Sequence, residues 1–263
     1  MRLPWGARIL IRPYETIGSN IWYYGIFDLI VAEAIDRLLD AGETGIDIGA
    51  NIGQMTSLMS RRAGEKGKVL SFEPHPDVFA ELCANIPFRE KKKGFSPVSL
   101  YNLGLSDREG NAVMEIGPDW ANNRGTARIA STEAKAAAQT VKIQVGTLEK
   151  ILGRDTEVAV CKIDVEGHEL KVFQGASHLL GERRIRDILF EDENPCPTEV
   201  QKMLIGHGYT IFSMHIRLPG PLLLPLTNPP ARVNRRDRPD FLATLDPQRA
   251  LERFRLRGWR VLK

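Results

Sequence analysis

The feature that most constrains the fold is an alternation of short apolar runs with segments of helical periodicity. Apolar runs bounded by Gly or Pro are typical of buried strands, and apolar residues three and four apart are typical of helices. Strands are predicted at 44–50, 68–74, 98–106, 157–167, 186–193 and 209–214. Helices are predicted between them, at 26–41, 54–62, 77–85, 169–180 and 198–208.

This order of elements predicts an α/β fold with a doubly wound, mostly parallel sheet of seven strands and helices on both faces. We expect residues 106–116 to return along the same sheet and residues 117–140 to form a loop with some helix. The proline-rich residues 217–239 are also expected to form a loop, before a last strand near 240–245 and a basic amphipathic helix at 247–259.

The expected organisation is one sheet domain with a short addition at each end. A lead segment with a helix spans 1–40, the sheet domain spans 41–245, and the basic C-terminal helix lies within 246–263. No internal repeat interrupts this pattern, and 263 residues suffice for a sizeable core.

Cysteine content and hydropathy limit the classes of protein to which the chain can belong. Cys83, Cys161 and Cys196 are an odd number without C-x-x-C spacing, which argues against a disulfide framework or a zinc site. The N-terminus has no apolar stretch typical of a secretory signal, and no run approaches the ~18 apolar residues of a membrane-spanning helix. We therefore expect a soluble, cytoplasmic protein.

A glycine-rich turn, Asp47-Ile48-Gly49-Ala50-Asn51-Ile52-Gly53, follows the first predicted strand. Glycine lets a ligand approach the backbone closely, and the N-terminus of the next helix attracts a carboxylate. In doubly wound sheets, ligands bind at the carboxyl ends of the strands, where the strand order reverses. Asp47 is suited to an ammonium group, so the turn is predicted to hold an amino-acid end such as that of methionine. The alternative is a tight turn capped by Asn51.

Acidic and polar residues also follow the next two strands. Glu73 stands about where nucleoside-binding folds place an acid that accepts hydrogen bonds from both ribose hydroxyls. After the third strand, Leu103 or Leu105 is suited to packing on an adenine ring, and Ser106 or Asp107 to bonding its edge. A surface acid and a plain polar turn are the respective alternatives.

The densest group of ionisable residues is Lys162-Ile163-Asp164-Val165-Glu166-Gly167-His168-Glu169, at the carboxyl end of a predicted strand. Crowded carboxylates raise one another's pKa, which is one way to prepare a general base. Asp164 and Glu166 are therefore candidate catalytic residues, whereas Glu169 is placed to cap the next helix. Glu191, after the following strand, is a further candidate, with a solvated acidic loop as the alternative.

With these residues the chain resembles the FkbM-type methyltransferases, from about Ile21 to Met214. The motifs that carry the resemblance are WYYGIFD (22–28), GIDIGANIG (45–53), SFEPHP (71–76), NLGLSDREG (102–110), VGTLEKIL (145–152), KIDVEGHEL (162–170), QGA (174–176) and ILFED (188–192). The resemblance implies a Rossmann-like class I methyltransferase fold, S-adenosylmethionine as methyl donor, and transfer usually to a hydroxyl. Acceptors in the family include sugars, glycolipids and polyketide-type natural products.

The resemblance also implies roles for individual residues. The implied donor-binding positions are Asp47, Gly49, Ala50, Asn51 and Gly53 for the methionine end, Glu73 and Pro74 for the ribose, Leu105, Ser106 and Asp107 for the adenine, and Asp164 beside the methyl group. Residues 1–40 would help to shape the acceptor pocket. The family often has Tyr-Glu where this chain has Phe27-Asp28, and Asp where it has Glu149; the first departure puts the acceptor in doubt rather than the donor.

A sugar hydroxyl needs a base to take its proton. The predicted catalytic residues are His168, Glu166, Asp164 and Glu191. His168 is the first choice for the base because imidazole is mostly neutral near pH 7, and Glu166 is the second. Replacing both is expected to abolish turnover and leave donor binding intact. We expect no metal; magnesium held by Asp164, Glu166 and Glu191 is the alternative.

The partner expected is a small-molecule or glycan acceptor. The net charge of +3 is too small to indicate nucleic acid, although arginines concentrate after residue 232. For the helix at 247–259 we favour an apolar side packed on the domain; contact with RNA or with an anionic membrane surface is the alternative. The alternative function is an RNA-directed methyltransferase or a nucleic-acid-binding protein. A nicotinamide-dependent oxidoreductase is disfavoured because the chain lacks G-x-G-x-x-G.

Overall fold

The computed structural model describes residues 1–86, 93–130, 139–153, 156–192, 197–227 and 240–263. The strands of its main sheet are β1 (Thr44–Ile48), β2 (Lys68–Phe72), β3 (Val98–Tyr101), β8 (Val158–Ile163), β9 (Ile185–Glu191), β10 (Thr210–Arg217), β11 (Gly220–Pro225) and β12 (Asp240–Thr244). The helices are α1 (Thr16–Tyr24), α2 (Leu29–Leu38), α3 (Gln54–Ala63), α4 (Pro76–Asn85), α6 (Leu148–Leu152), α7 (Glu169–Gln174), α8 (Ser177–Gly181), α9 (Glu199–Gly206) and α10 (Pro247–Phe254).

The described strands of the main sheet follow the order β11-β10-β12-β9-β8-β1-β2-β3. The half from β3 to β9 is parallel, and β12, β10 and β11 add antiparallel pairs. β1 lies between β2 and β8, where the chain order reverses, so the carboxyl ends of these strands form the place at which such sheets bind ligands. The predicted doubly wound α/β fold is confirmed, with eight strands in place of seven.

The additional strand, β11, overturns part of the prediction of a loop at 217–239. Pro221 and Pro225 pair in register with Ile216 and Phe212 of β10. A proline has no N–H to donate, but β11 is the edge strand and has a neighbour on one side only. The same prediction at residues 228–239 lies outside the described residues.

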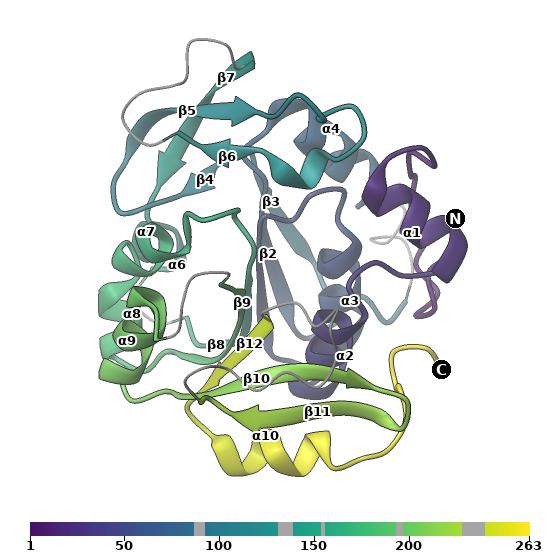
Figure 1. Ribbon diagram of the computed structural model, residues 1–263, viewed down its shortest axis with the longest axis vertical. Helices are drawn as coiled ribbons and strands as arrows, with labels where there is room; N and C mark the ends of the chain where they lie inside the picture. The colour runs from purple at the N-terminus through teal and green to yellow at the C-terminus, as the bar shows by residue number, and fades with distance from the viewer. Residues whose placement is uncertain (87–92, 131–138, 154–155, 193–196, 228–239) are drawn as a thin grey trace.

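The two faces of the main sheet carry separate cores. On one face, Ile46 and Ile48 of β1 pack with α7, α8 and α9; on the other, α2 and α3 cover the sheet (Figure 1). Because side chains alternate along a strand, Asp47 points to the second face, where its carboxylate accepts a hydrogen bond of 2.6 Å from Thr56 of α3.

A smaller sheet lies over one end of the main sheet, at the top of Figure 1. Its strands are β4 (Gly104–Leu105), β5 (Gly110–Ile116), β6 (Arg128–Ile129) and β7 (Gln139–Gly146). The expectation that residues 106–116 return along the main sheet is wrong, because β5 pairs with β7 along its whole length. The connection from β5 to β6 contains a short 3₁₀ helix, Arg124–Thr126, and residues 131–138 lie outside the described part.

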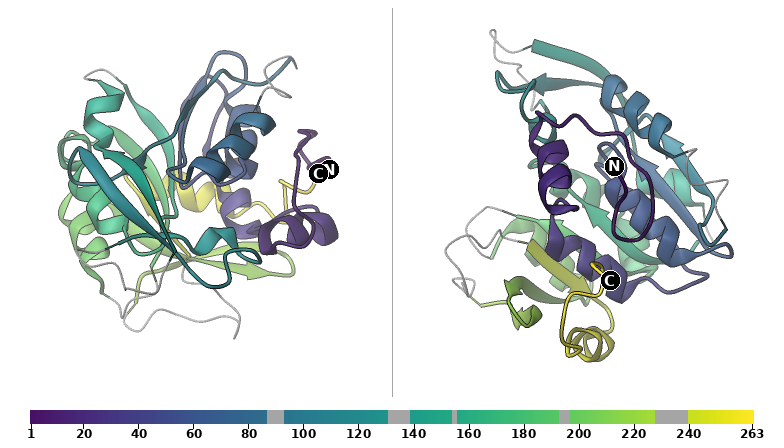
Figure 2. Two further views of the ribbon diagram at one scale, coloured as in Figure 1. Left: turned by 90° about the horizontal axis from the view of Figure 1, so that it is seen from above. Right: turned by 90° about the vertical axis from the view of Figure 1, so that its right-hand side faces the viewer.

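The N-terminal segment reaches this small sheet through α1. The backbone N–H of Thr16 donates to the carbonyl of Asn122 at 2.8 Å, and the Thr16 hydroxyl donates to the same oxygen. In the view from above (Figure 2, left), the teal connection between β5 and β6 meets the purple α1. Two segments about 100 residues apart are therefore joined directly.

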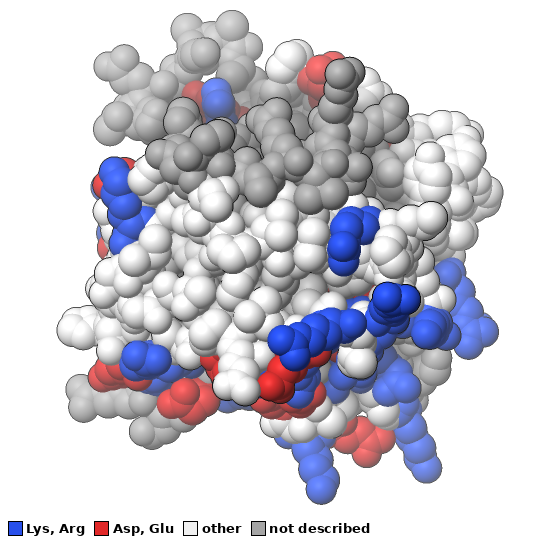
Figure 3. All heavy atoms as spheres, turned by 60° about the horizontal axis from the view of Figure 1, so that its bottom comes forward, with Lys and Arg blue, Asp and Glu red and all other residues white. Residues whose placement is uncertain are grey.

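The C-terminal helix packs on the domain, as we favoured. Ala250 and Phe254 of α10 are buried, and Arg253 forms an ion pair of 2.6 Å with Asp40. The face seen in Figure 3 carries a band of Lys and Arg mixed with acidic side chains. None of the described helices is long and apolar enough to span a bilayer.

Candidate functional site

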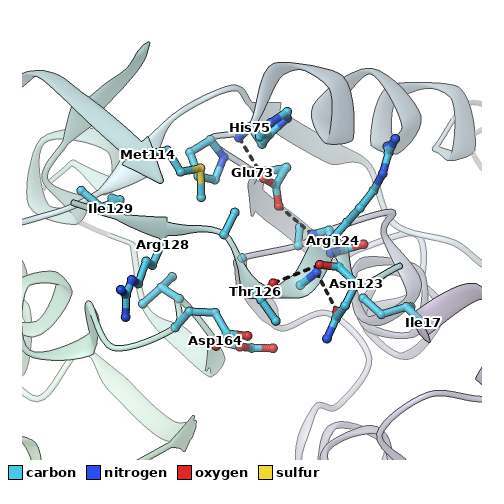
Figure 4. A pocket seen from close by; sticks show the side chains of 18 of the residues that line it. Ile17, Glu73, His75, Met114, Asn123, Arg124, Thr126, Arg128, Ile129 and Asp164 are labelled. Atoms are coloured by element: carbon cyan, nitrogen blue, oxygen red, sulfur yellow. Dashed lines mark hydrogen bonds between the residues drawn. The ribbon is translucent and has the colours of Figure 1, made fainter. Parts of the chain in front are cut away.

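A cavity of about 1350 Å³ lies at the carboxyl ends of β1, β2 and β8. Turns after these strands form one wall, which we call the donor wall because the sequence predicts the methyl donor there. The small sheet, the β5–β6 connection and the start of α1 form the opposite wall, which we call the acceptor wall in keeping with that prediction (Figure 4). Doubly wound sheets are expected to bind ligands in this region, at the carboxyl ends of the strands.

The glycine-rich turn of the donor wall takes a shape that few residues permit. Gly49, Asn51 and Gly53 all have positive φ, of 74°, 49° and 89°. A Cβ on Gly49 would lie 1.9 Å from the carbonyl oxygen of Asp164, so glycine is required there. Gly53 then precedes α3, so the turn delivers the free N–H groups of a helix N-terminus to the cavity edge.

Glu73 follows β2 and is held by the same turn. Its two carboxylate oxygens accept backbone N–H groups, from Asn51 at 3.0 Å and from His75 at 2.9 Å. Burial raises the pKa of Glu73 to about 7, against the opposing effect of these hydrogen bonds. Each carboxylate oxygen retains acceptor capacity for a ligand hydroxyl.

Lys162 is a buried cation behind the donor wall. Its Nζ donates to the carbonyl of Gly49 at 2.8 Å and lies 3.5 Å from Asp47 and 3.4 Å from Asp164. Burial lowers the pKa of Lys162, but the two carboxylates outweigh this and raise it overall. The single positive charge of Lys162 thus contacts Asp47 of β1, the Gly49 carbonyl of the glycine-rich turn, and Asp164 of the acidic loop that follows β8.

The acidic loop after β8 is a second tight turn. Glu166 has a φ of 53° and is followed by Gly167 with a φ of 92°. The carboxylate of Glu169, the first residue of α7, accepts the backbone N–H groups of Val165 and Gly167 at 3.3 and 3.2 Å. These N–H groups belong to the loop and not to the helix, whose N-cap position is His168. A positive φ in a non-glycine residue persists only where its surroundings enforce it, and this turn places Glu166 in the cavity lining.

The acceptor wall is held by side chains. His75 and Trp120 stack with ring centroids 4.4 Å apart, and the Arg124 guanidinium lies 5.6 Å from the Trp120 ring. Arg124 also pairs with Glu81 of α4 at 2.6 Å. These contacts fasten the β5–β6 connection over the cavity.

One amide joins the donor wall to the segment between α1 and α2. The side chain of Gln54, the first residue of α3, donates to the carbonyl of Phe27 at 2.6 Å and accepts the N–H of Phe27 at 2.8 Å. Phe27 and Asp28 both line the cavity. The donor turn is thereby hydrogen-bonded to the segment where this sequence departs from the usual Tyr-Glu.

The cavity collects most but not all of the predicted site residues. Those that line it are Gly49, Ala50, Asn51, Glu73, Pro74, Leu105, Asp164, Glu166 and Glu191. Those outside its lining are Asp47, Gly53, Ser106, Asp107 and His168.

His168 lies in a separate polar cluster. Its Nε2 is 3.0 Å from the Ser106 hydroxyl, which donates to Asp107, and Asp107 pairs with Lys171 at 2.7 Å. Burial lowers the pKa of the His168 imidazole. The structure therefore does not bring His168 to Asp164 and Glu166 in the cavity, nor Ser106 and Asp107 to its wall.

Several residues of the site were not among those predicted. Lys162 belongs to the ionisable group found in the sequence but was given no role there; the strand register places it directly beside Asp47 in the neighbouring strand. Trp120, Arg124 and Arg128 lie in a segment without periodicity, so the sequence gives no signal for them. Among the described side chains, no three acids, His or Cys form a group that could hold a metal ion.

The doubly wound sheet, the glycine turn after β1 and the buried acid after β2 define an α/β enzyme domain with a nucleoside-type cavity. The family model for the methyltransferase FkbM domain matches residues 47–211, which span the sheet from β1 into β10. The chain belongs to the FkbM methyltransferase family, and the predicted resemblance is confirmed.

Two curated relatives are methyltransferases. The hexuronic acid methyltransferase AglP of Haloferax volcanii is 33% identical over 180 residues, covering 67% of this chain and 66% of the relative. The match therefore spans slightly less than two thirds of AglP. The methyltransferase sdnD of Sordaria araneosa is 25% identical over 194 residues, covering 63% of this chain and 73% of that protein.

A solved FkbM methyltransferase from Methylobacillus flagellatus is similar at a TM-score of 0.44 with 15% identity. That similarity covers 89% of this chain and 48% of the other.

Proposed function

We propose that this chain transfers the methyl group of S-adenosylmethionine to a hydroxyl oxygen of a sugar-type acceptor. The observation that carries the proposal is one cavity with two chemically different walls. Ligand pockets usually measure ~300–1000 Å³, so about 1350 Å³ suits a donor and an acceptor together. The named substrate of AglP, a hexuronic acid, favours a sugar over other acceptors.

The donor wall fits S-adenosylmethionine. Glu73 is buried, fixed at both oxygens and still able to accept ribose hydroxyls. The turn at Gly49 would let a donor approach the backbone, and Asp164, which lines the cavity, would offer its carboxylate to a positively charged group of the donor. When bound, the donor supplies an electrophilic methyl carbon, and its sulfur keeps the electron pair of the bond that breaks.

The chain's own contribution is to align the acceptor and to take a proton. Glu166 lines the cavity on a turn that Glu169 holds in place, so we assign it as the base that accepts the hydroxyl proton while the oxygen bonds to carbon. Asp164, anchored by Lys162, orients the reacting groups, and Glu191 lines the cavity beside them. His168 is a supporting residue of the Ser106 cluster in this proposal.

Calorimetry and labelled turnover test the proposal. Wild-type protein should bind S-adenosylmethionine and S-adenosylhomocysteine at one site and show no heat with NAD⁺. Glu166→Gln should lower kcat by ~100-fold or more while donor Kd stays within twofold. Glu182→Gln, at a largely exposed position away from the cavity, is the matched control. No heat with either donor form would refute the proposed function.

A further inference from the structure

The cations of the cavity differ in how fully the protein itself neutralises them. Among the described residues, the Lys and Arg side chains that line the cavity are Arg124, Arg128 and Lys162. Lys162 is buried between Asp47 and Asp164, and Arg124 is paired with Glu81 at 2.6 Å and packed on Trp120. These two are occupied by structural contacts.

Arg128 is different. Its side chain is 58% exposed, and within the described part of the chain its contact is an ion pair of 3.5 Å between its Nε and Glu115. Arg128 and Glu115 are cross-strand partners in β6 and β5, so they share a face of the small sheet. Arg128 lines the cavity, and Figure 4 shows it on the same wall as Ile129 and Met114, across from Glu73.

The position of Arg128 separates it from the donor. Glu73 and the glycine turn stand on the donor wall, whereas Arg128 comes from the acceptor wall with Thr126 and Ile129 (Figure 4). The acids nearest the reaction, Asp164 and Glu166, suit a positively charged donor and repel an anionic acceptor. The positive charge of Arg128 on the opposite wall would attract an anionic group at one end of the acceptor and so offset this repulsion.

We propose that Arg128 binds a carboxylate of the acceptor, so that the substrate class is a sugar acid, a uronic acid residue, methylated at a hydroxyl. The inference rests on the proposed function and adds that the acceptor carries a negative charge. A guanidinium presents N–H groups in a planar fork that matches a carboxylate. A single arginine beside Glu115 suits a monoanion better than a doubly charged phosphate.

Matched acceptors that differ only at C6 test the charge requirement. The assay follows transfer from methyl-labelled S-adenosylmethionine to methyl glucopyranosiduronic acid, to methyl glucopyranoside and to its 6-phosphate. Wild-type kcat/KM should be at least ~10-fold higher for the uronate than for either of the others, because a charge-assisted hydrogen bond is involved. The parallel galacturonate series covers the other common ring configuration.

Variants of Arg128 then assign the effect to this residue. Arg128→Gln should raise KM for the uronate by ~10-fold or more with a small change in kcat, and leave the neutral sugar unaffected. Arg128→Lys keeps the positive charge but lacks the planar fork of N–H groups. Its KM for the uronate should therefore lie between the values of the wild type and of Arg128→Gln. Arg257→Gln, at an exposed arginine outside the cavity lining, is the control.

A binding readout separates this inference from the proposed function. Uronate binding to the protein saturated with S-adenosylhomocysteine is measured by calorimetry, and donor Kd is measured for every variant. The sugar-acid proposal is overturned, while methyl transfer stands, by either of two results. One is an equal kcat/KM for the uronate and the neutral sugar in the wild type. The other is an equal loss of kcat/KM for both acceptors in Arg128→Gln. A preference for the 6-phosphate overturns the carboxylate. Absence of donor binding overturns the proposed function itself, and donor binding without turnover or binding of any sugar excludes a sugar acceptor.

Discussion

The two walls of the cavity are built in different ways. The donor wall consists of tight main-chain turns after β1, β2 and β8, where Gly49 touches Asp164 and both oxygens of Glu73 accept amides. The acceptor wall consists of a short sheet and a connection held by ring stacking and by the Arg124–Glu81 ion pair. Main-chain contacts tolerate few substitutions, whereas exposed side-chain contacts can be exchanged at a cost of ~1 kcal/mol.

Under the proposed function, this difference matches what each ligand requires of its wall. Enzymes that use the same methyl donor must all bind the same molecule, so a rigid binding wall is an advantage. Acceptors differ, and a wall made of replaceable side chains can follow them without disturbing the donor. Substitutions in the donor wall should therefore act on folding and donor binding together, and those in the acceptor wall on acceptor KM alone.

The largest effect is expected for Gly49→Ala. The added Cβ would meet the Asp164 carbonyl at 1.9 Å and the φ of 74° is itself unfavourable, so we expect a loss of ~3 kcal/mol or more and no measurable donor binding. Gly42→Ala is the control, because Gly42 has a φ of 89° with nothing within 4 Å of its Cβ. It should cost ~1–2 kcal/mol in urea unfolding and leave donor Kd unchanged. Equal behaviour of the two variants would show that the close approach is unimportant.

The next effect is expected for Lys162→Met, which leaves the carboxylate of Asp47 buried without its cation. Loss of one partner of a buried pair costs ~3–5 kcal/mol. The double variant Asp47→Asn/Lys162→Met removes the stranded charge and should recover most of that stability. Donor Kd should remain raised in the double variant, because Asp164 and the Gly49 carbonyl still lack their anchor. Recovery of donor binding as well would reduce Lys162 to a purely structural role.

The pH dependence of the donor wall should follow Glu73. Its pKa is raised by burial from the ordinary 4.5 to about 7, so the folded protein holds a proton that the unfolded chain releases. Stability of the ligand-free protein should therefore fall as pH rises from about 4.5 to about 7, by ~3 kcal/mol. Donor binding should improve over pH 6–8, since ribose hydroxyls donate to the ionised form. Glu73→Gln should flatten both profiles; unchanged profiles would contradict the assignment.

A smaller and more selective effect is expected for Trp120→Ala. Without the ring stacked on His75, the β5–β6 connection loosens, and acceptor KM should rise by ~10-fold with donor Kd within twofold. Trp22→Ala, at an exposed tryptophan of α1 outside the cavity lining, is the control. Steady-state kinetics with each ligand varied in turn measures both constants. A weakened donor affinity would break the separation of the two walls.

The smallest effect is expected for His168→Asn. The imidazole is bonded to Ser106 outside the cavity lining, so kcat/KM should stay within about threefold of wild type, as for a surface polar substitution. A loss of ~100-fold would restore His168 as the base, the role first expected from its place beside Glu166.

The donor wall was largely predictable because its signals are local. A buried strand followed by Gly49 and Gly53, and an acid after the next strand, define the turn and the position of Glu73 within short stretches of sequence. The positions of Asp47 and His168 were not predictable in the same way. Asp47 alternates away from Ile46 and Ile48, which strand periodicity implies but the assignment of Asp47 to the ligand did not take into account. The turn at Glu166 and Gly167 places His168 outside the cavity, and its positive φ angles are not encoded in a local pattern.

The acceptor wall was much less predictable. Trp120 and Arg128 lie in a segment without hydrophobic periodicity, and they reach the cavity only because β5 pairs with β7 in a sheet of its own. The contact of Thr16 with Asn122 joins residues far apart in sequence, which no local pattern encodes. The edge strand β11 was missed for the opposite reason, since its prolines are a strong loop signal that an edge position overrides.

The paired hydrogen bonds between Gln54 and Phe27 limit which residues can stand at the start of α3. A side-chain amide supplies a donor and an acceptor to the same peptide unit, which neither a carboxylate nor an ammonium group can do. Glutamate at position 54 would leave the Phe27 carbonyl without its donor, and lysine would leave the Phe27 N–H without its acceptor.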